Sequence, residues 1–183
     1  MLGHNETQPR LSFKEQPAGR LHPILIPMIL RQAVPADIRQ IQAVRRAVKE
    51  NRLSDPALVT DADCNDYITR RGKGWVCEST GTVVGFSIAD LVDRNVWALF
   101  VHPDFEHRGI GRKLHDLMLN WFFDQTQETI WLSTDPGTRA FGFYTAAGWT
   151  HNGFQANGEA RFEMTHRQWQ FRNATSTRMR DGG

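Results

Sequence analysis

The feature that most constrains the fold is an apolar run followed by two closely spaced glycines and a helical pattern. Val96–Val101 are six consecutive apolar residues with β-branched and aromatic side chains, and a His-Pro pair ends the run. Such a run predicts a strand covered on both faces. Beyond Gly109 and Gly111, apolar residues recur every three or four positions, which predicts an amphipathic helix over about 110–125. Because glycine lacks a Cβ and a helix N-terminus carries unpaired N–H groups, this junction predicts a cradle for an anionic group.

Two familiar phosphate-binding loops do not fit this junction. A Walker A loop ends in Gly-Lys-Ser/Thr, which does not occur here. The dinucleotide fingerprint needs a third glycine at the position that Leu114 occupies. The glycine pattern by itself therefore leaves the kind of anion open.

Three segments together resemble a known family. Glu106-His107-Arg108-Gly109-Ile110-Gly111 is similar to the coenzyme A pyrophosphate loop of the GNAT superfamily of N-acetyltransferases, usually written Gln/Arg-x-x-Gly-x-Gly/Ala. Phe143-Tyr144 with Gly148-Trp149 resembles the end of that superfamily's later short helix, Phe-Tyr-x-x-x-Gly-Phe/Trp. Residues 29–38 look like its opening strand and the cap of its first helix. The segments occur in the right order, and the resemblance covers roughly 28–166.

The resemblance implies an α+β (three-layer α/β) fold. We expect a mixed, mostly antiparallel central sheet, splayed between its fourth and fifth strands, with helices on both faces. The N-acetyltransferase domain is expected over 28–167, after an extension of little periodicity over 1–27. The short basic tail over 168–183 is expected to be solvated. The expected strands are about 28–33, 75–78, 83–91, 96–101, 129–133, 149–154 and 160–165, and the expected helices about 35–49, 62–71, 110–125 and 137–147.

The resemblance also implies acetyl-coenzyme A as co-substrate and a primary amine that attacks its thioester directly. The backbone of Leu99, Phe100 and Val101 would pair with the pantetheine arm, and a backbone N–H there would polarise the thioester carbonyl. The glycine loop and the first helical turn would hold the pyrophosphate. The remaining residues expected to contact the cofactor are His107, Arg108, Gly109, Ile110, Gly111, Arg112, Lys113, Thr138 and Phe143.

The resemblance further implies that Tyr144 is the catalytic residue, as the general acid that protonates the leaving thiolate. A phenol with a pKa of about 10 and a thiol with a pKa of about 8.5 are close enough for this transfer. The competing interpretation is a core tyrosine that packs the short helix. The general base is unassigned, because the predicted fourth strand holds no glutamate or histidine. Glu78, Asp90, Asp93 and Ser133 lie near strand ends, where they could act through water.

Two positions depart from the superfamily pattern. Glu106 stands where glutamine or arginine is usual, and a carboxylate that faced inward would repel a pyrophosphate, so we expect its side chain to face away. Thr138 stands where asparagine is common, and its hydroxyl can still cap the helix or reach the pantetheine arm. Neither departure indicates an inactive site.

Composition argues against two classes of partner. A net charge of +2, from 22 basic and 20 acidic residues, gives no electrostatic case for nucleic acid. Trp97, Trp121 and Trp131 fall on predicted core faces and not beside a basic groove. No apolar run approaches the roughly 20 residues that span a bilayer, so we expect no membrane partner and a cytoplasmic location.

The cysteines and histidines do not suggest a metal site. Cys64 and Cys77 fit no metal-binding spacing and are expected to be reduced thiols. His102, His107 and His115 lack the spacing of a zinc-binding helix and are expected to be solvated. We therefore expect no metal.

The acceptor is expected to be a small-molecule or peptide amine, but its identity is not readable from the sequence. The segments that would build its pocket are 50–62, the turn at Asp93 and 150–160, which vary freely in the superfamily. Homodimers are common in the superfamily and stay open here. The alternative function is a non-catalytic acyl-coenzyme A-binding sensor or partner-binding module on the same fold, and Tyr144 favours the enzyme.

Overall fold

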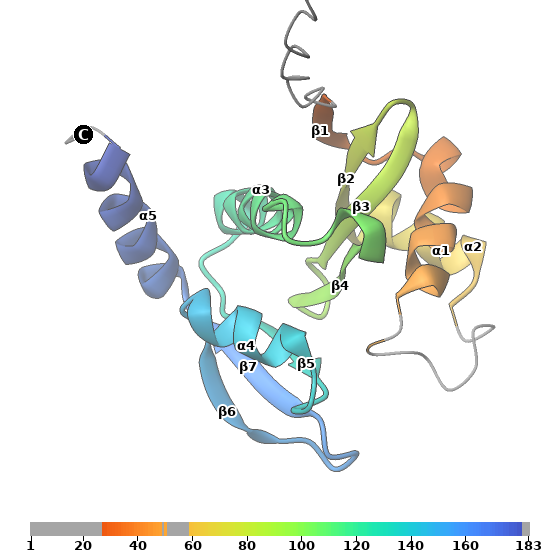
Figure 1. Cartoon of the computed structure of the whole chain (residues 1–183). Coiled ribbons are helices and arrows are strands. Elements are labelled where there is room, and N and C mark those ends of the chain that lie inside the picture. Colours follow the sequence, from red (N-terminus) through yellow and green to blue (C-terminus); the bar gives the residue numbers. More distant parts are fainter. Residues whose placement is uncertain (1–26, 49, 51–58, 181–183) are drawn as a thin grey trace, which may run out of the picture.

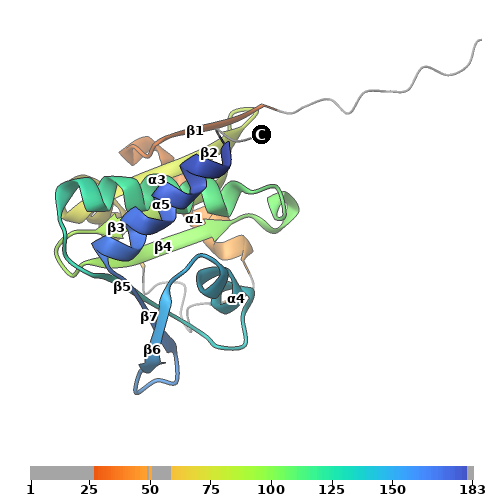
Figure 2. The same cartoon turned by 90° about the vertical axis from the view of Figure 1, so that its left-hand side faces the viewer.

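A seven-stranded sheet in the order β1-β2-β3-β4-β5-β7-β6 forms the centre of this computed structural model, with helices on both faces (Figure 1; Figure 2). The structure describes residues 27–48, 50 and 59–180, with the side chains of 175–180 excepted. Neighbouring strands pair antiparallel except β4 and β5, which are parallel. The predicted fold class is confirmed.

The elements follow one another closely along the chain. The strands are β1 (Met28–Gln32), β2 (Gly72–Ser79), β3 (Thr82–Asp90), β4 (Asn95–Val101), β5 (Ile130–Thr134), β6 (Thr150–Phe154) and β7 (Ala160–Met164). The α-helices are α1 (Ile38–Ala47), α2 (Asp61–Asp66), α3 (Ile110–Gln125), α4 (Arg139–Ala146) and α5 (His166–Arg180). Short 3-10 turns cover Pro35–Asp37 and Pro103–Phe105, and a π-helical turn, Tyr67–Arg71, extends α2.

β4 and β5 are paired only where they begin. Asn95 and Trp131 form the single register pair between them in the described part of the chain. The backbone N–H of Trp131 also donates to the carbonyl of Arg94 at 3.0 Å. Beyond this point β5 pairs with β7 along its whole length, and the β5-β7-β6 part of the sheet turns away from β4 (Figure 2). The predicted splay between the fourth and fifth strands is confirmed.

Each face of the sheet has its own apolar core. On one face, α1 and α2 bury Ile41 and Val44 against Phe86 of β3. On the other face, α3 contributes the fully buried Leu114 and Phe122. Because the 3.6-residue period of α3 places its apolar residues on one side, the helix lies flat on the sheet and its N-terminus is brought to the end of β4.

β4 packs against a core on each face, as predicted, but most of its side chains are only partly buried. Within the strand only Ala98 is fully buried. Trp97 is the extra residue of a β-bulge opposite β3. Leu99 and Val101 pack against the core under α3, and Phe100 against the core under α1. These side chains stay partly exposed because the splay removes the neighbouring strand.

The predicted helices are largely confirmed. α3 matches the predicted 110–125, and α4 is shorter than the predicted 137–147. Thr60 begins α2 with a capping box, in which the Asp63 backbone N–H donates to the threonine hydroxyl at 3.1 Å and the Thr60 N–H donates to the Asp63 carboxylate at 2.8 Å. The predicted extension over 1–27, except Pro27, and most of the predicted acceptor segment 50–62 lie outside the described residues.

A helix that was not predicted, α5, occupies most of the C-terminal tail; its described side chains are exposed or partly exposed, in line with the expectation, except Trp169, which is buried. Trp169 is 3% exposed and stacks on Phe123 of α3 at 6.2 Å between ring centres. Arg172 donates to Asp116 of α3 at 3.0 Å. The apolar residues of α5 do not recur at helical spacing, so contact with α3 and not amphipathic pattern holds the helix in place. None of the helices in the described ranges has the length and apolar character needed to cross a bilayer.

Candidate active site

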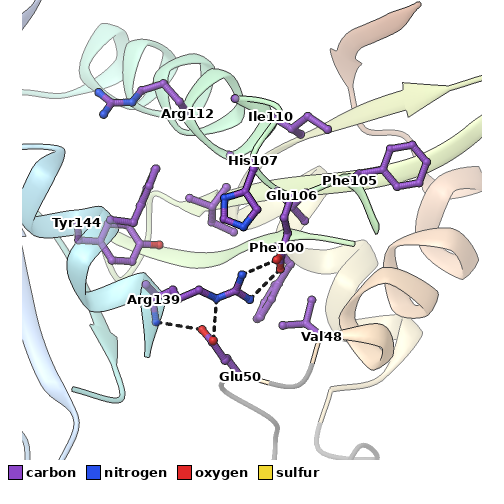
Figure 3. Close-up of a pocket in the computed structure, with 16 residues that line it drawn as sticks. Val48, Glu50, Phe100, Phe105, Glu106, His107, Ile110, Arg112, Arg139 and Tyr144 are labelled. Carbon is purple, nitrogen blue, oxygen red and sulfur yellow. Dashed lines mark hydrogen bonds and ion pairs between the residues drawn. The ribbon is translucent and has the colours of Figure 1, made fainter. Parts of the chain in front are cut away.

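A cleft of about 490 Å³ opens where β4 and β5 separate. Its walls come from the end of β4, the loop before α3, the first turn of α3, α4 and the residues after α1 (Figure 3). Ten of the residues predicted from the sequence line this cleft: Leu99, Phe100, Val101, His107, Gly109, Ile110, Gly111, Arg112, Phe143 and Tyr144.

The N-terminus of α3 is an open set of hydrogen-bond donors. Gly109 holds the left-handed conformation (φ 75°) at the N-cap position, and no side chain caps the helix. A Cβ on Gly109 would meet nothing within 4 Å, and a Cβ on Gly111 would meet only Val101 Cγ2 at 3.7 Å. Free space therefore faces the N–H groups of the first turn. Such a terminus, with Arg112 beside it, fits a pyrophosphate.

Three predicted residues do not line the cleft. Arg108 donates to the carbonyl of Asp104 at 3.1 Å, and Lys113 is exposed outside the cleft. Thr138 stands at the N-cap of α4, but its hydroxyl donates to the carbonyl of Asp135 at 2.7 Å and makes no capping hydrogen bond. Of the two roles considered for this hydroxyl, capping the helix is therefore excluded.

Arg139, at the start of α4, is the central charged group of the cleft and was not predicted. Its guanidinium donates to both carboxylate oxygens of Glu106, and its Nε donates to Glu50 at 2.8 Å (Figure 3). Its backbone N–H donates to Glu50 at 3.0 Å. An arginine in the first turn of a helix opposes the helix dipole, and this is the sequence signal that could have pointed to it.

Glu106 does not face away from the cleft as expected; it lines it. The hydrogen bonds and positive charge of Arg139 hold the pKa of the Glu106 carboxyl below its usual value. Glu106 is therefore ionised at neutral pH, and Arg139 offsets its charge. Because Glu106 follows β4 and Arg139 follows β5, this ion pair spans the splay of the sheet.

Tyr144 is 6% exposed, and its hydroxyl points into the cleft (Figure 3). The rings of Phe143, Trp149 and Phe162 surround it at 5.2, 5.5 and 6.1 Å between ring centres. In the described part of the chain, no side chain or backbone group makes a hydrogen bond to the hydroxyl. Burial raises the pKa of Tyr144, so the phenol stays protonated and offers a donor to the cleft. The ring is part of the core while the hydroxyl belongs to the cleft.

The residues considered as bases near strand ends do not reach the cleft. Each is held by another side chain: Glu78 by Arg31, Asp90 and Asp93 by Arg71, and Ser133 by Glu159. His107 brings an imidazole to the cleft, from a backbone with φ 58° that is uncommon outside glycine.

The expectation of solvated histidines was wrong for His115. It is fully buried and accepts a hydrogen bond from Trp149. Cys64 and Cys77 are free and buried. Within the described ranges, no three histidine, cysteine, aspartate or glutamate side chains gather as a metal site would require.

The tryptophans agree with expectation in part. Trp97 and Trp121 are partly buried and pack against the two cores, Trp131 is partly buried, and the buried tryptophans are Trp75, Trp149 and Trp169. Trp97 is turned aside by the β-bulge and stacks on Tyr67 at 4.2 Å between ring centres.

Comparison with known proteins identifies the family of this chain. The model of the family described as "Acetyltransferase (GNAT) family" matches residues 38–149, which is more than half of the chain. Comparison with curated proteins gives no match.

Many solved structures share the fold. PaiA N-acetyltransferase from Thermoplasma acidophilum, in complex with coenzyme A, superposes with a TM-score of 0.68 at 14% identity, over 76% of this chain and 99% of that one. The ribosomal-protein-S18-alanine N-acetyltransferase of Escherichia coli gives 0.60 at 15% identity, over 75% and 92%. An N-acetyltransferase from Staphylococcus aureus Mu50 gives 0.66 at 15% identity, over 76% and 99%. At these sequence identities the similarity shows a shared fold and nothing more.

Proposed function

This chain belongs to the acetyltransferase (GNAT) family, and from that premise we propose that it transfers the acetyl group of acetyl-coenzyme A to a primary amine by direct attack. The observation that carries the proposal is one cleft that joins three elements. They are the open edge of β4, the uncapped N-terminus of α3 and the hydroxyl of Tyr144.

Each end of the cleft suits one part of the co-substrate, which supplies an activated acetyl group when bound. The N–H groups after Gly109 and Gly111, with Arg112, bind the pyrophosphate. The edge of β4 at Leu99–Val101 has no strand beside it, so its backbone pairs with the extended pantetheine arm. A backbone N–H of this segment stabilises the negative charge that develops on the carbonyl oxygen.

Tyr144 acts as general acid. Its raised pKa makes the free phenol a weaker acid than tyrosine in water, but the same apolar surroundings also disfavour a thiolate. The hydroxyl therefore donates to the leaving sulfur as negative charge develops there. Glu106 does not act as a base near neutral pH, because Arg139 holds the pKa of its carboxyl low. The amine loses its proton to water in the open cleft.

The acceptor is a small-molecule or peptide amine. Two structural neighbours carry names that give a ribosomal-protein alanine as the acceptor, which supports a peptide α-amine as one form of it. A cytoplasmic location and a homodimer stay predictions.

The test is release of free coenzyme A thiol from acetyl-coenzyme A in the presence of single amines from a panel of amino acids, peptides, polyamines and aromatic amines. Thiol release that depends on one class of amine supports the proposal. Calorimetric binding of coenzyme A with no thiol release for any amine would contradict it and support a non-catalytic sensor.

A further inference from the structure

Ring packing alone directs the Tyr144 hydroxyl into the cleft. Within the described residues no hydrogen bond holds that hydroxyl. The rings of Phe143 and Trp149 meet the tyrosine edge-on, at 5.2 and 5.5 Å between ring centres. A general acid must lie within about 3 Å of the atom that it protonates, so a small rotation of the tyrosine would slow the reaction. A group that fixes these two rings therefore also fixes the proton donor.

His115, on α3, contacts both of these rings. Its Nε2 accepts a hydrogen bond from the Trp149 indole at 2.9 Å, and its ring meets that of Phe143 edge-on at 5.6 Å between centres. The other ring nitrogen lies 2.9 Å from Asp116, which leaves Nε2 as the acceptor. His115 is fully buried, so water does not replace this acceptor if it is lost.

The turn after α4 brings Trp149 back beside Tyr144. The backbone N–H of Trp149 donates to the carbonyl of Tyr144 at 3.1 Å, and Gly148 between them has φ 82°. The two residues are thus joined both through the backbone and ring to ring. A displacement of the indole is therefore transmitted to the tyrosine.

His115 takes no direct part in the chemistry. It is not among the described residues that line the cleft, and it has no exposed surface, so it touches neither co-substrate nor acceptor. Filling of the core does not explain an imidazole either, because an apolar side chain fills the core without the cost of burying polar nitrogens. The hydrogen bond to Trp149 does explain it.

We infer that His115 is a positioning residue for the general acid: it holds the Trp149 indole and the Phe143 ring, and these keep the Tyr144 hydroxyl aimed into the cleft. The inference rests on the proposed function, in which Tyr144 protonates the leaving thiolate. One helix then sets both ends of the reaction, because α3 offers its N-terminus to the pyrophosphate and orients the acid from its second turn.

The experiment uses two variants that each keep half of the hydrogen bonding of the imidazole. The amide of His115→Gln reaches the place of Nε2, where its oxygen accepts from Trp149. The shorter amide of His115→Asn reaches only the place of Nδ1, beside Asp116. His115→Asn should lower kcat about 10- to 100-fold and leave KM for acetyl-coenzyme A within about twofold, whereas His115→Gln should keep most of kcat. Trp149→Phe removes the indole donor and should lower kcat as His115→Asn does.

A second comparison separates positioning from general damage to the structure. In a Tyr144→Phe background, His115→Asn should cause no further fall in kcat, because the donor that it positions is already gone. His166→Gln is the matched control, at a partly exposed histidine that packs on Phe123 of the same α3, and should leave kcat unchanged. If thermal melting shows that His115→Asn does not fold, the same comparison with Trp149→Phe decides. An equal fall in both backgrounds would overturn the inference, as would an unaltered kcat in folded His115→Asn.

Carbon-13 NMR distinguishes failure of this inference from failure of the proposed function. The chain has two tyrosines, Tyr67 and Tyr144, so tyrosine labelled at Cζ gives two signals, which Tyr144→Phe assigns. The Tyr144 signal should move in His115→Asn and stay near its wild-type position in His115→Gln, while the Tyr67 signal stays in both. If no amine releases thiol, the proposed function fails, and these signals alone decide whether His115 orients Tyr144. A Tyr144 signal that is the same in the wild type and in His115→Asn would refute the positioning role.

Discussion

The indole Nε1–H of Trp149 donates a 2.9 Å hydrogen bond to Nε2 of His115, and neither residue is more than 5% exposed. Because Nε2 accepts, the neutral imidazole carries its proton on Nδ1, which lies 2.9 Å from Asp116 Oδ1. Arg172 of α5 donates to the same carboxylate oxygen. The end of α4, α3 and α5 are thereby linked through one buried histidine.

This histidine predicts a loss of stability in mild acid. Burial lowers the pKa of His115 in the folded protein; Asp116 opposes this effect, and the charges of Arg172 and Arg112 add to it. Its contribution is therefore complete above the unfolded pKa of about 6.5 and is lost as the pH falls below it. Between pH 7.5 and 5.5 the free energy of unfolding should fall by about 1 kcal/mol from this residue, measured by urea titration. The dependence should weaken in His115→Asn and persist in His151→Asn; an unchanged dependence in His115→Asn would exclude this origin.

Tyr144→Phe should reduce kcat by about 10²- to 10⁴-fold and leave calorimetric binding of coenzyme A nearly unchanged. The ring still fills its place among Phe143, Trp149 and Phe162, so only the donor to the cleft is lost. Because burial raises the pKa of Tyr144, ionisation of the phenol should not limit wild-type kcat between pH 7 and 9. A kcat that is unaltered in the variant at several pH values would refute the role of proton donor.

Gly111→Val should abolish coenzyme A binding without unfolding the protein. The first carbon of the new side chain fits, since its nearest neighbour is 3.7 Å away, but the branched methyl groups extend into the space before the α3 N–H groups. Gly111→Ala is the matched control and should bind more weakly than wild type but measurably. Calorimetry gives the affinities and thermal melting the stability. Tight binding by Gly111→Val would show that the pyrophosphate lies elsewhere.

Arg139 should be needed for binding of acetyl-coenzyme A because it neutralises the charge of Glu106. In Arg139→Gln the Glu106 carboxylate loses its counter-charge beside the anionic co-substrate, so KM for acetyl-coenzyme A should rise about tenfold, and less at high salt. Glu106→Gln removes the repulsion, and the double variant should recover most of the lost affinity. The four proteins form a double-mutant cycle measured by KM. Additive effects of the two changes would contradict the coupling.

Replacing Gly142 or Gly148 by alanine should change the free energy of unfolding in opposite directions. Gly142 is exposed within α4, its φ is not positive and a Cβ there meets nothing within 4 Å, so Gly142→Ala should stabilise the protein by about 0.5–1 kcal/mol. Gly148, just after α4, has φ 82°, so Gly148→Ala should destabilise it by about 1–2 kcal/mol. Both are read from urea titrations. Stabilisation by both changes would contradict the backbone conformation described for Gly148.

The parts of the fold that follow local rules could be predicted. The apolar period after Gly111 defined α3 to its ends, and the cluster of polar and glycine residues between β2 and β3 marked their hairpin, where Thr80 and Gly81 both have positive φ. α5 escaped prediction because Trp169, its buried anchor, rests on α3, which lies far away in sequence.

The residues of the candidate site likewise divide into those that the sequence predicts and those that it does not. Gly109 and Gly111 were recognisable because a close backbone approach demands glycine, and Tyr144 was recognisable because it stands in a pattern that resembles the family's later short helix. The first-turn position of Arg139 was a signal in the sequence, but its ion pairs were not predictable, because its partners Glu106 and Glu50 lie 33 and 89 residues away.

By itself, then, the sequence determined the order of the strands and of the helices before α5, the helix that opens on two glycines, and the family to which they belong. Only the tertiary structure decided which groups line the cleft. Separation of β4 from β5 exposed one edge of an apolar strand and placed the ion pair of Arg139 and Glu106 across the gap. The reason is physical: periodicity and turn chemistry act between neighbours along the chain, whereas charge pairing and burial depend on distances that exist only after the chain has folded.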